Sequence, residues 1–198
     1  RTAWLIKHKL LEVMRQREED RQLTGRIEMD DAYLGGERHG GTAGRGSENK
    51  VSFVAAVQTM EAGRPHLACF SKRAFTKESL REFMTTSIAL PATVVSDGLN
   101  CFTVARELGM AHDRTVTGGG RASVEVENHW AINTVLGNLK TAMAGTYHAI
   151  KFAKYAHRYL AEVQYRFNRR YDLRAILPRL VRAASLTANM SEATVRGC

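Results

Sequence analysis

The sequence predicts an α/β protein with a mixed five-stranded sheet flanked by helices, followed by a helical C-terminal extension. Short apolar segments recur between residues 26 and 116 and are separated by helical patterns and by polar or glycine-rich loops. From about residue 127 the pattern is helical almost to the end. The composition, with 44% hydrophobic and 25% charged residues, is that of an ordinary globular protein.

The first segment, residues 1–23, predicts a helix. Trp4, Leu11 and Met14 form an apolar stripe, and the residues that follow Met14 are mostly polar. Because the chain opens at Arg1 in what reads as the middle of a helix, we expect that an upstream part is missing.

Three strands are predicted next. Residues 26–34 alternate loosely between apolar and polar side chains, and residues 51–57 and 66–70 are short apolar runs. Residues 35–46 contain six glycines and predict a loop. Three consecutive strands joined by loops are typical of an antiparallel meander.

The remaining elements alternate before the helical extension. We expect a helix over residues 76–88 with Thr76 as its N-cap, a buried strand over 93–96, a helix over 101–108 and a fifth strand over 111–116. A loop over residues 117–123 follows. The long helical region is expected to break near Gly145 and near Pro178.

The positive charge is concentrated in one segment. Residues 24–137 carry 12 basic and 13 acidic residues, whereas residues 138–183 carry 10 basic and 2 acidic residues, and the net charge of the chain is +9. Such a segment indicates a polyanionic partner, nucleic acid before membrane. The sequence has no apolar run long enough to span a membrane, and we expect no membrane partner.

Two aspartates predict a metal site. Asp30 lies within the first strand, where alternation places Glu28 and Asp30 on one face and Asp31 on the other. Asp97 ends the fourth strand. Each carboxylate alone is compatible with a solvated edge strand or a turn, but together they would meet near the middle of the sheet. Hard divalent cations such as Mg²⁺ or Mn²⁺ prefer such oxygen ligands, and a pair of ions about 4 Å apart serves phosphodiester chemistry.

A third ligand is expected from the long helix that follows. The candidates are Glu125, Glu127 and Asn133. Asn133 shares a helical face with Lys140, so that face offers an amide oxygen for a metal and a cation for a phosphate.

Several segments carry a resemblance to a known family. They are IEMDDAYLGGERHGG (27–41), VVSDG (94–98), HWAINTVLGNLKTAMAGTYHAI (129–150) and YRFNRRYD (165–172). In this order they resemble the DDE-superfamily transposases of bacterial insertion sequences, in particular the ISXO-like subgroup, some of whose members have Asn in place of the final Glu.

The resemblance implies an RNase H-like fold, a two-metal site with Mg²⁺ or Mn²⁺, and cleavage and joining of DNA strands. It assigns Asp30, Asp97 and Asn133 as metal ligands and Lys140 as the basic residue beside them. It also implies three parts: residues 1–23 as the last helix of an upstream DNA-binding helix-turn-helix region, 24–148 as the catalytic domain, and 149–198 as a basic helical extension. The implied partners are double-stranded DNA and, in the synaptic complex, further copies of the chain.

The helical extension is expected to contact the DNA backbone. Aromatic and apolar residues at helical spacing, among them Tyr155, Tyr159 and Phe167, should face the core. The basic residues should form a solvent-facing row that serves, with Lys140, as the DNA-binding surface. That row comprises Lys151, Lys154, Arg158, Arg166, Arg169 and Arg170.

Two alternatives remain open from the sequence. The neutral Asn133 and the truncated start are compatible with a catalytically inactive, DNA-binding transposon remnant, and a related nuclease that cuts without joining has the same site. The three cysteines are scattered and odd in number, which argues against a disulfide framework and indicates a reducing, cytoplasmic location.

Overall fold

The computed structural model describes residues 1–35, 50–115, 129–147 and 152–197. The chain divides into two compact units. The terminal unit combines Arg1–Arg21 with His157–Cys198, and the sheet unit comprises Gln22–Ala156. Helix α5 (Phe152–Phe167) begins in the sheet unit and ends in the terminal unit.

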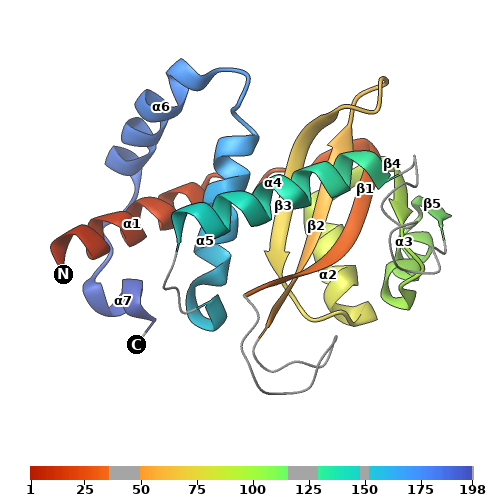
Figure 1. Ribbon diagram of the computed structural model, residues 1–198, viewed down its shortest axis with the longest axis horizontal. Helices are drawn as coiled ribbons and strands as arrows, with labels where there is room; N and C mark the ends of the chain where they lie inside the picture. The colour runs from red at the N-terminus through yellow and green to blue at the C-terminus, as the bar shows by residue number, and fades with distance from the viewer. Residues whose placement is uncertain (36–49, 116–128, 148–151, 198) are drawn as a thin grey trace. The chain divides into compact units, whose positions relative to one another are not determined.

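The sheet unit is built on five strands. They are β1 (Leu23–Leu34), β2 (Val51–Thr59), β3 (Pro65–Lys72), β4 (Ile88–Ser96) and β5 (Ala111–Arg114). Their order is β3-β2-β1-β4-β5, in which β1, β2 and β3 pair antiparallel while β4 is parallel to both β1 and β5. This arrangement confirms the predicted meander and the RNase H-like mixed sheet (Figure 1).

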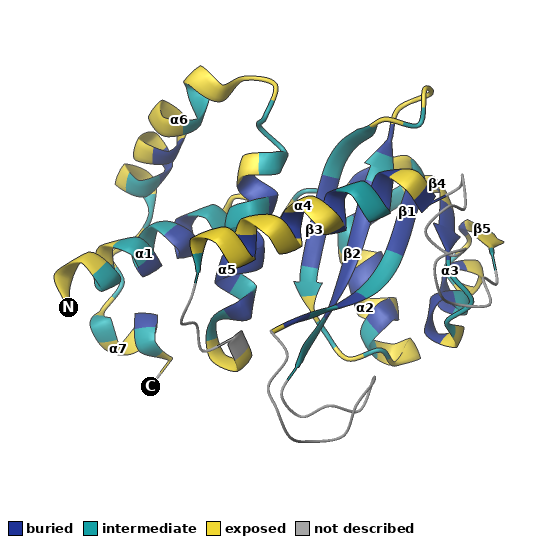
Figure 2. Ribbon diagram, in the orientation of Figure 1, coloured by how far each residue is buried: buried dark blue, intermediate teal, exposed yellow. Residues whose placement is uncertain are grey.

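Helices cover both faces of the sheet. On one face α2 (Lys77–Ser87), the 3₁₀ helix η1 (Asn100–Thr103) and α3 (Val104–Glu107) share a buried core with Ile27 and Met29 of β1. Because Glu28 points to the opposite face, its hydrogen bond to the backbone of α4 (Trp130–Thr146) places that helix on the other side. The alternation of buried and exposed residues along these helices is visible in Figure 2.

The start of the fourth strand differs from the prediction. Thr76 caps α2 as expected, since its side chain accepts a hydrogen bond from the Ser79 N–H at 3.2 Å. Helix α2 ends at Ser87, however, and β4 begins directly at Ile88 rather than at residue 93. The first half of β4 includes the exposed residues Leu90 and Pro91, which interrupt the apolar pattern and hide the strand in the sequence.

The terminal unit is helical. It contains α1 (Thr2–Gln16), most of α5, α6 (Leu173–Leu186) and α7 (Glu192–Arg196), and it confirms the helical extension. The expected break near Pro178 is wrong, because α6 runs through this residue and the chain breaks before Leu173 instead. Pro178 is the sixth residue of α6, so its missing N–H removes the backbone hydrogen bond to the Arg174 carbonyl, and the helix continues past it. Among the helices of the described residues, none has both the length and the apolar character needed to cross a membrane.

Candidate active site

The carboxylates of β1 lie where its neighbour β4 ends. Met29 is the last residue of β1 that pairs with β4, opposite Ser96, whereas Asp30 and Asp31 pair only with Ala55 and Val54 of β2. Asp97 follows directly after the end of β4. Beyond Met29, the edge of β1 is no longer covered by β4, and we call this the open edge. The carboxylates of β1 and Asp97 after β4 therefore lie at the same end of the β1–β4 pair.

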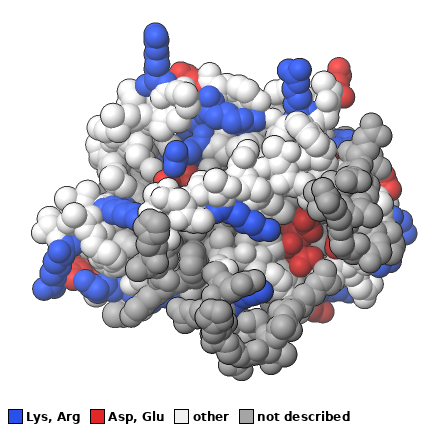
Figure 3. All heavy atoms as spheres, in the orientation of Figure 1, with Lys and Arg blue, Asp and Glu red and all other residues white. Residues whose placement is uncertain are grey.

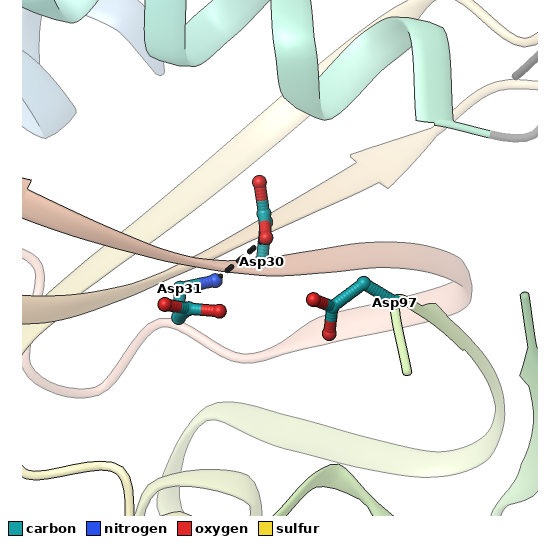
Figure 4. Close-up of side chains that lie close together, drawn as sticks. All are labelled: Asp30, Asp31 and Asp97. Carbon is teal, nitrogen blue, oxygen red and sulfur yellow. Dashed lines mark hydrogen bonds between the residues drawn. The ribbon is translucent and has the colours of Figure 1, made fainter. Parts of the chain in front are cut away.

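Three carboxylates meet at this open edge. Asp30, Asp31 and Asp97 each contribute an oxygen, and these atoms all lie within 4.8 Å of one another. Figure 4 shows the carboxylates of Asp31 and Asp97 pointing toward each other, with Asp30 beside them. The side chains are partly exposed, and acidic groups are visible at the surface in Figure 3. The structure thus joins the two predicted aspartates and adds Asp31, which simple alternation had placed on the other face.

Local hydrogen bonds orient two of these carboxylates. Asp30 Oδ1 accepts the Asp31 N–H at 2.9 Å, and Asp97 Oδ1 accepts the Leu99 N–H at 3.0 Å. The second bond holds the turn that follows β4.

Crowding of negative charge changes the acidity of Asp30. Burial and, to a smaller extent, the charges of Asp31 and Asp97 together raise the pKa of Asp30 to about 7. The hydrogen bond from the Asp31 N–H and the charge of Lys140 oppose this rise. The site is therefore an environment in which additional positive charge would favour the ionised form of Asp30.

Glu28 has a structural role beside the cluster. Its side chain is only 2% exposed, its Oε1 pairs with Arg26 Nη1 at 2.6 Å, and its Oε2 accepts the Ile132 N–H at 2.9 Å. A carboxylate at a helix N-terminus satisfies a backbone donor and interacts favourably with the helix dipole. Glu28 thereby fixes the first turn of α4 on β1, next to Asn133.

The helix α4 carries the other predicted residues. Asn133 is partly buried in the second turn, and Lys140 is exposed two turns later. Lys140 is close enough to lower the pKa of Asp30 by its charge. The role of Asn133 as a metal ligand stays a prediction, and the alternatives Glu125 and Glu127 lie outside the described residues.

A cleft extends from the cluster along β1. It has a volume of about 740 Å³, and we call it the downstream cleft because it begins at Asp31 and continues toward the end of β1. Lys50 and Lys140 both line it, together with Tyr33 and Tyr147. Two lysines beside a carboxylate cluster are suited to bind one phosphate of a nucleic-acid strand while the adjacent phosphate of the same strand lies at the carboxylates.

The predicted basic row of α5 is only partly on the surface. Arg158 is 6% exposed, and it pairs through Nε with Glu12 Oε2 at 2.8 Å and donates to the Val195 carbonyl. The expectation that Arg158 faces solvent is wrong, because the buried side of α5 is centred on other residues than the predicted aromatic stripe. The buried positions are Ala156, Arg158, Tyr159, Leu160, Ala161, Gln164 and Tyr165.

The other cations of the row have varied environments. Arg169 is also mostly buried, because it pairs with Glu18 and lies over the Tyr165 ring at 3.6 Å. Arg170 stacks on the Phe167 ring at 3.8 Å, whereas Lys154 and Arg166 are exposed. Lys151 lies outside the described residues. DNA contact by Lys154, Arg166 and Arg170 stays a prediction.

Comparisons with known proteins agree with the resemblance. The family described as the ISXO2-like transposase domain matches residues 22–168. No curated protein matches the sequence.

The solved structures that are similar to the chain include two complexes. One is the simian T-cell lymphotropic virus intasome in complex with PP2A regulatory subunit B56 gamma, with 11% identity, a TM-score of 0.42, and coverage of 73% of this chain and 48% of that chain. The other is the Mos1 transposase paired-end complex with the left transposon end, with 7% identity, a TM-score of 0.30, and coverage of 91% and 63%. The chain thus spans less than two thirds of the length of either structure that it matches.

Proposed function

Because the chain belongs to the family of ISXO2-like transposase domains, we propose that it cuts and joins DNA strands with the help of divalent cations. The observation that carries this proposal is the convergence of Asp30, Asp31 and Asp97 at the end of β4. This activity is that of the catalytic domain of an insertion-sequence transposase.

The donor set fits a hard divalent cation. Three carboxylates within 4.8 Å supply the oxygen ligands that Mg²⁺ or Mn²⁺ prefers. Burial and the charges of Asp31 and Asp97 raise the pKa of Asp30, and a cation would balance those charges. Asp30 and Asp97 would hold the cations, with Asp31 or Asn133 completing the site. When bound, a pair of such ions activates an attacking oxygen and stabilises the leaving oxygen of a phosphodiester.

The protein's own residues position the DNA strand. Lys140 and Lys50 line the downstream cleft and would neutralise the phosphates next to the one that reacts. Glu28 holds the start of α4 on β1, so that Lys140 of α4 keeps a fixed place relative to the carboxylates. No nucleophilic side chain is required, because water or a DNA hydroxyl attacks the phosphorus directly.

A third carboxylate favours catalysis over the inactive alternative. The neutral Asn133 weakens a site of two aspartates, but Asp31 restores the negative charge that a glutamate would supply. The partners proposed with this function are double-stranded DNA and further copies of the chain in a synaptic complex.

A nicking assay tests the proposal. Supercoiled plasmid DNA is incubated with the protein and Mg²⁺ or Mn²⁺, and nicking is compared with that of Asp30→Asn and Asp97→Asn. Asp113→Asn is the matched control, since Asp113 is an exposed carboxylate on β5 outside the cluster. We expect both cluster variants to lose nicking and to keep DNA binding, while the control nicks normally.

Three outcomes would be decisive. Nicking by Asp30→Asn at the rate of the unmodified protein contradicts the assigned site. A protein that binds DNA but nicks with neither cation is the inactive remnant. Nicking of DNA that carries transposon ends, without joining of the cut ends to a target, identifies a nuclease.

A further inference from the structure

A second cleft lies on the other side of the carboxylate cluster. It has a volume of about 640 Å³, and we call it the upstream cleft because it is lined by the part of β1 that precedes the aspartates. Its lining residues come from β1, the β2–β3 turn and the start of α4. They are Gly25, Arg26, Glu28, Thr59, Met60, Glu61, Ala62, Gly63 and Trp130.

The two clefts flank the candidate active site along one strand. Glu28 lines the upstream cleft and lies two residues before Asp30, a spacing of about 6.6 Å along a strand. The downstream cleft begins at Asp31. A DNA strand whose phosphodiester reaches the carboxylates while its chain follows β1 would therefore place its next nucleotides in both clefts.

The charges of the two clefts differ. The downstream cleft has Lys50 and Lys140 against the single carboxylate Asp31. The upstream cleft has Arg26 against Glu28 and Glu61, and the Arg26 guanidinium is already paired with Glu28. The upstream cleft thus repels a phosphate, and its surface suits a neutral group with an apolar face.

Its most prominent side chain is an exposed indole. Trp130 is 55% exposed and Met60 is 43% exposed, although most large apolar side chains of the sheet unit are buried. The glycines Gly25 and Gly63 have positive φ angles, and a Cβ at either would meet no atom within 4 Å, so this side of the cleft is open. Nucleobases stack on exposed aromatic side chains, because every base has an apolar π-face.

We propose that the upstream cleft binds an unpaired nucleobase of the DNA strand, stacked on Trp130, next to the phosphodiester at the carboxylates. This inference rests on the proposed function, because it takes DNA as the ligand of the neighbouring cluster. The occupant is a base from a locally unpaired strand, since a base within a duplex has both faces covered.

Fluorescence of Trp130 provides a direct test. The sequence contains two tryptophans, so Trp4→Phe leaves Trp130 as the sole indole. This protein is titrated, without divalent cation, with a duplex that carries a single-stranded thymidine overhang. The matched probe has the same overhang with abasic sites, which keeps the phosphates and removes the bases. We expect the thymidine overhang to quench the fluorescence and the abasic overhang to leave it nearly unchanged.

Binding affinity gives an independent measurement. Trp130→Ala should weaken binding of the thymidine-overhang duplex about 10-fold, the scale of one lost base–aromatic stack. Trp130→Phe should keep most of the affinity, and a fully paired blunt duplex should bind equally to all three proteins. Ile6→Ala is the control, because Ile6 is another apolar side chain that is 55% exposed, and it lies on α1.

The outcomes separate this inference from the proposed function. Equal quenching by both overhangs, or equal loss of affinity for overhang and blunt duplexes, overturns the base-binding site. So does unchanged affinity of Trp130→Ala for the overhang duplex. If the unmodified protein nicks DNA in any of these cases, the proposed function stands alone. If it neither binds nor nicks DNA, the proposed function itself fails.

Discussion

Three acidic residues of one strand have three different environments. Glu28 is buried and neutralised by Arg26 and a helix N-terminus. Asp31 and Asp97 point toward each other, and Asp30 lies beside them with an oxygen within 4.8 Å of theirs. Burial is the largest cause of the raised pKa of Asp30, and the like charges of Asp31 and Asp97 disfavour its ionised state further. The cluster therefore lowers stability when no cation is bound, as is common for a site that is arranged for a ligand.

The first prediction concerns this repulsion. Asp30→Asn removes one charge from the cluster and should raise the melting temperature of the protein in the absence of divalent cation. Added Mg²⁺ should raise the melting temperature of the unmodified protein, since binding stabilises the folded state, and should have little effect on the variant. Thermal unfolding followed by circular dichroism measures both effects.

Asp113→Asn serves again as the control, and it should respond to Mg²⁺ as the unmodified protein does. A lower melting temperature of metal-free Asp30→Asn would show that Asp30 stabilises the fold, contrary to this interpretation.

The second prediction concerns a buried histidine of the terminal unit. Burial and, to a smaller extent, the charges of Arg158, Lys7, His157 and Arg196 together lower the pKa of His8 from 6.5 to about 4. The unfolded state therefore binds more protons than the folded state between pH 6.5 and about 4. The contribution of neutral His8 to stability is complete above pH 6.5 and is lost as the pH falls toward 4.

Urea denaturation across this pH range measures the effect. The free energy of unfolding of His8→Leu should fall less between pH 6.5 and 4 than that of the unmodified protein. Leu11→Ala is the control, because it removes buried volume on the same helix without a titrating group and should shift the whole curve down. Parallel pH profiles for His8→Leu and the unmodified protein would exclude the role of His8.

The residues show where sequence reasoning succeeds. Asp30 and Asp97 could be predicted as neighbours because strand order alone brings the ends of β1 and β4 together. Asp31 could not, because alternation places it on the face opposite Asp30, and only the structure shows that β4 ends at Ser96 and leaves Asp31 and Asp97 next to each other at the open edge. Helical periodicity predicts Arg158 on the surface, opposite the aromatic stripe, because its buried partner Glu12 is 146 residues away in the sequence and gives no local signal.

At the scale of elements, α5 illustrates how one buried ion pair, Arg158 with Glu12, changes which side of a helix faces the interior. Tyr155 and Phe167 were expected to be core positions, yet both are only partly buried, while Gln164 is buried. The buried pair of Arg158 and Glu12 accounts for part of this difference, because a long side chain that is neutralised can occupy the interior. Periodicity therefore predicts that α5 exists and that Tyr159 is buried, but it places the centre of the buried side incorrectly.

The third prediction tests that pair. Arg158→Ala leaves Glu12 without its buried cation and should lower the free energy of unfolding by about 3 kcal/mol. Lys154→Ala, which removes an exposed cation from the same helix, should change it by less than about 0.5 kcal/mol. Urea denaturation of both variants makes the comparison. Equal stability of the two would mean that Arg158 is not part of the interior.

At the scale of the whole molecule, the two units carry very different charges. The terminal unit, residues 1–21 and 157–198, has 14 basic and 7 acidic residues and a net charge of +7. The sheet unit, residues 22–156, has 15 basic and 13 acidic residues and a net charge of +2. The sequence located the excess in residues 138–183, but only the fold adds the first 21 residues to the same unit. Under the proposed function, cleavage belongs to the sheet unit, and most of the nonspecific attraction to DNA comes from the terminal unit.

The last prediction follows from a cluster of arginines in the terminal unit. Arg17, Arg169, Arg179 and Arg182 line a cleft of about 220 Å³, and all but Arg169 are exposed. Replacing Arg17, Arg179 and Arg182 with Gln should flatten the dependence of log affinity on log salt by about 2 to 3, since each phosphate contact contributes a slope of about −0.9. The loss should be similar for every DNA sequence, because phosphate contacts carry no base information.

A matched variant separates this cleft from net charge. Replacing Arg64, Lys77 and Arg81 with Gln removes three cations from the sheet unit, two of which already pair with Glu107. This control should keep most of the salt dependence, although its net charge changes by the same amount. If both triple variants flatten the salt dependence of affinity equally, DNA binding depends on the net charge of the protein, and the arginine cleft is not a specific contact site. If only the terminal-unit variant does so and it still nicks DNA at low salt, binding and cleavage reside in different units of the molecule.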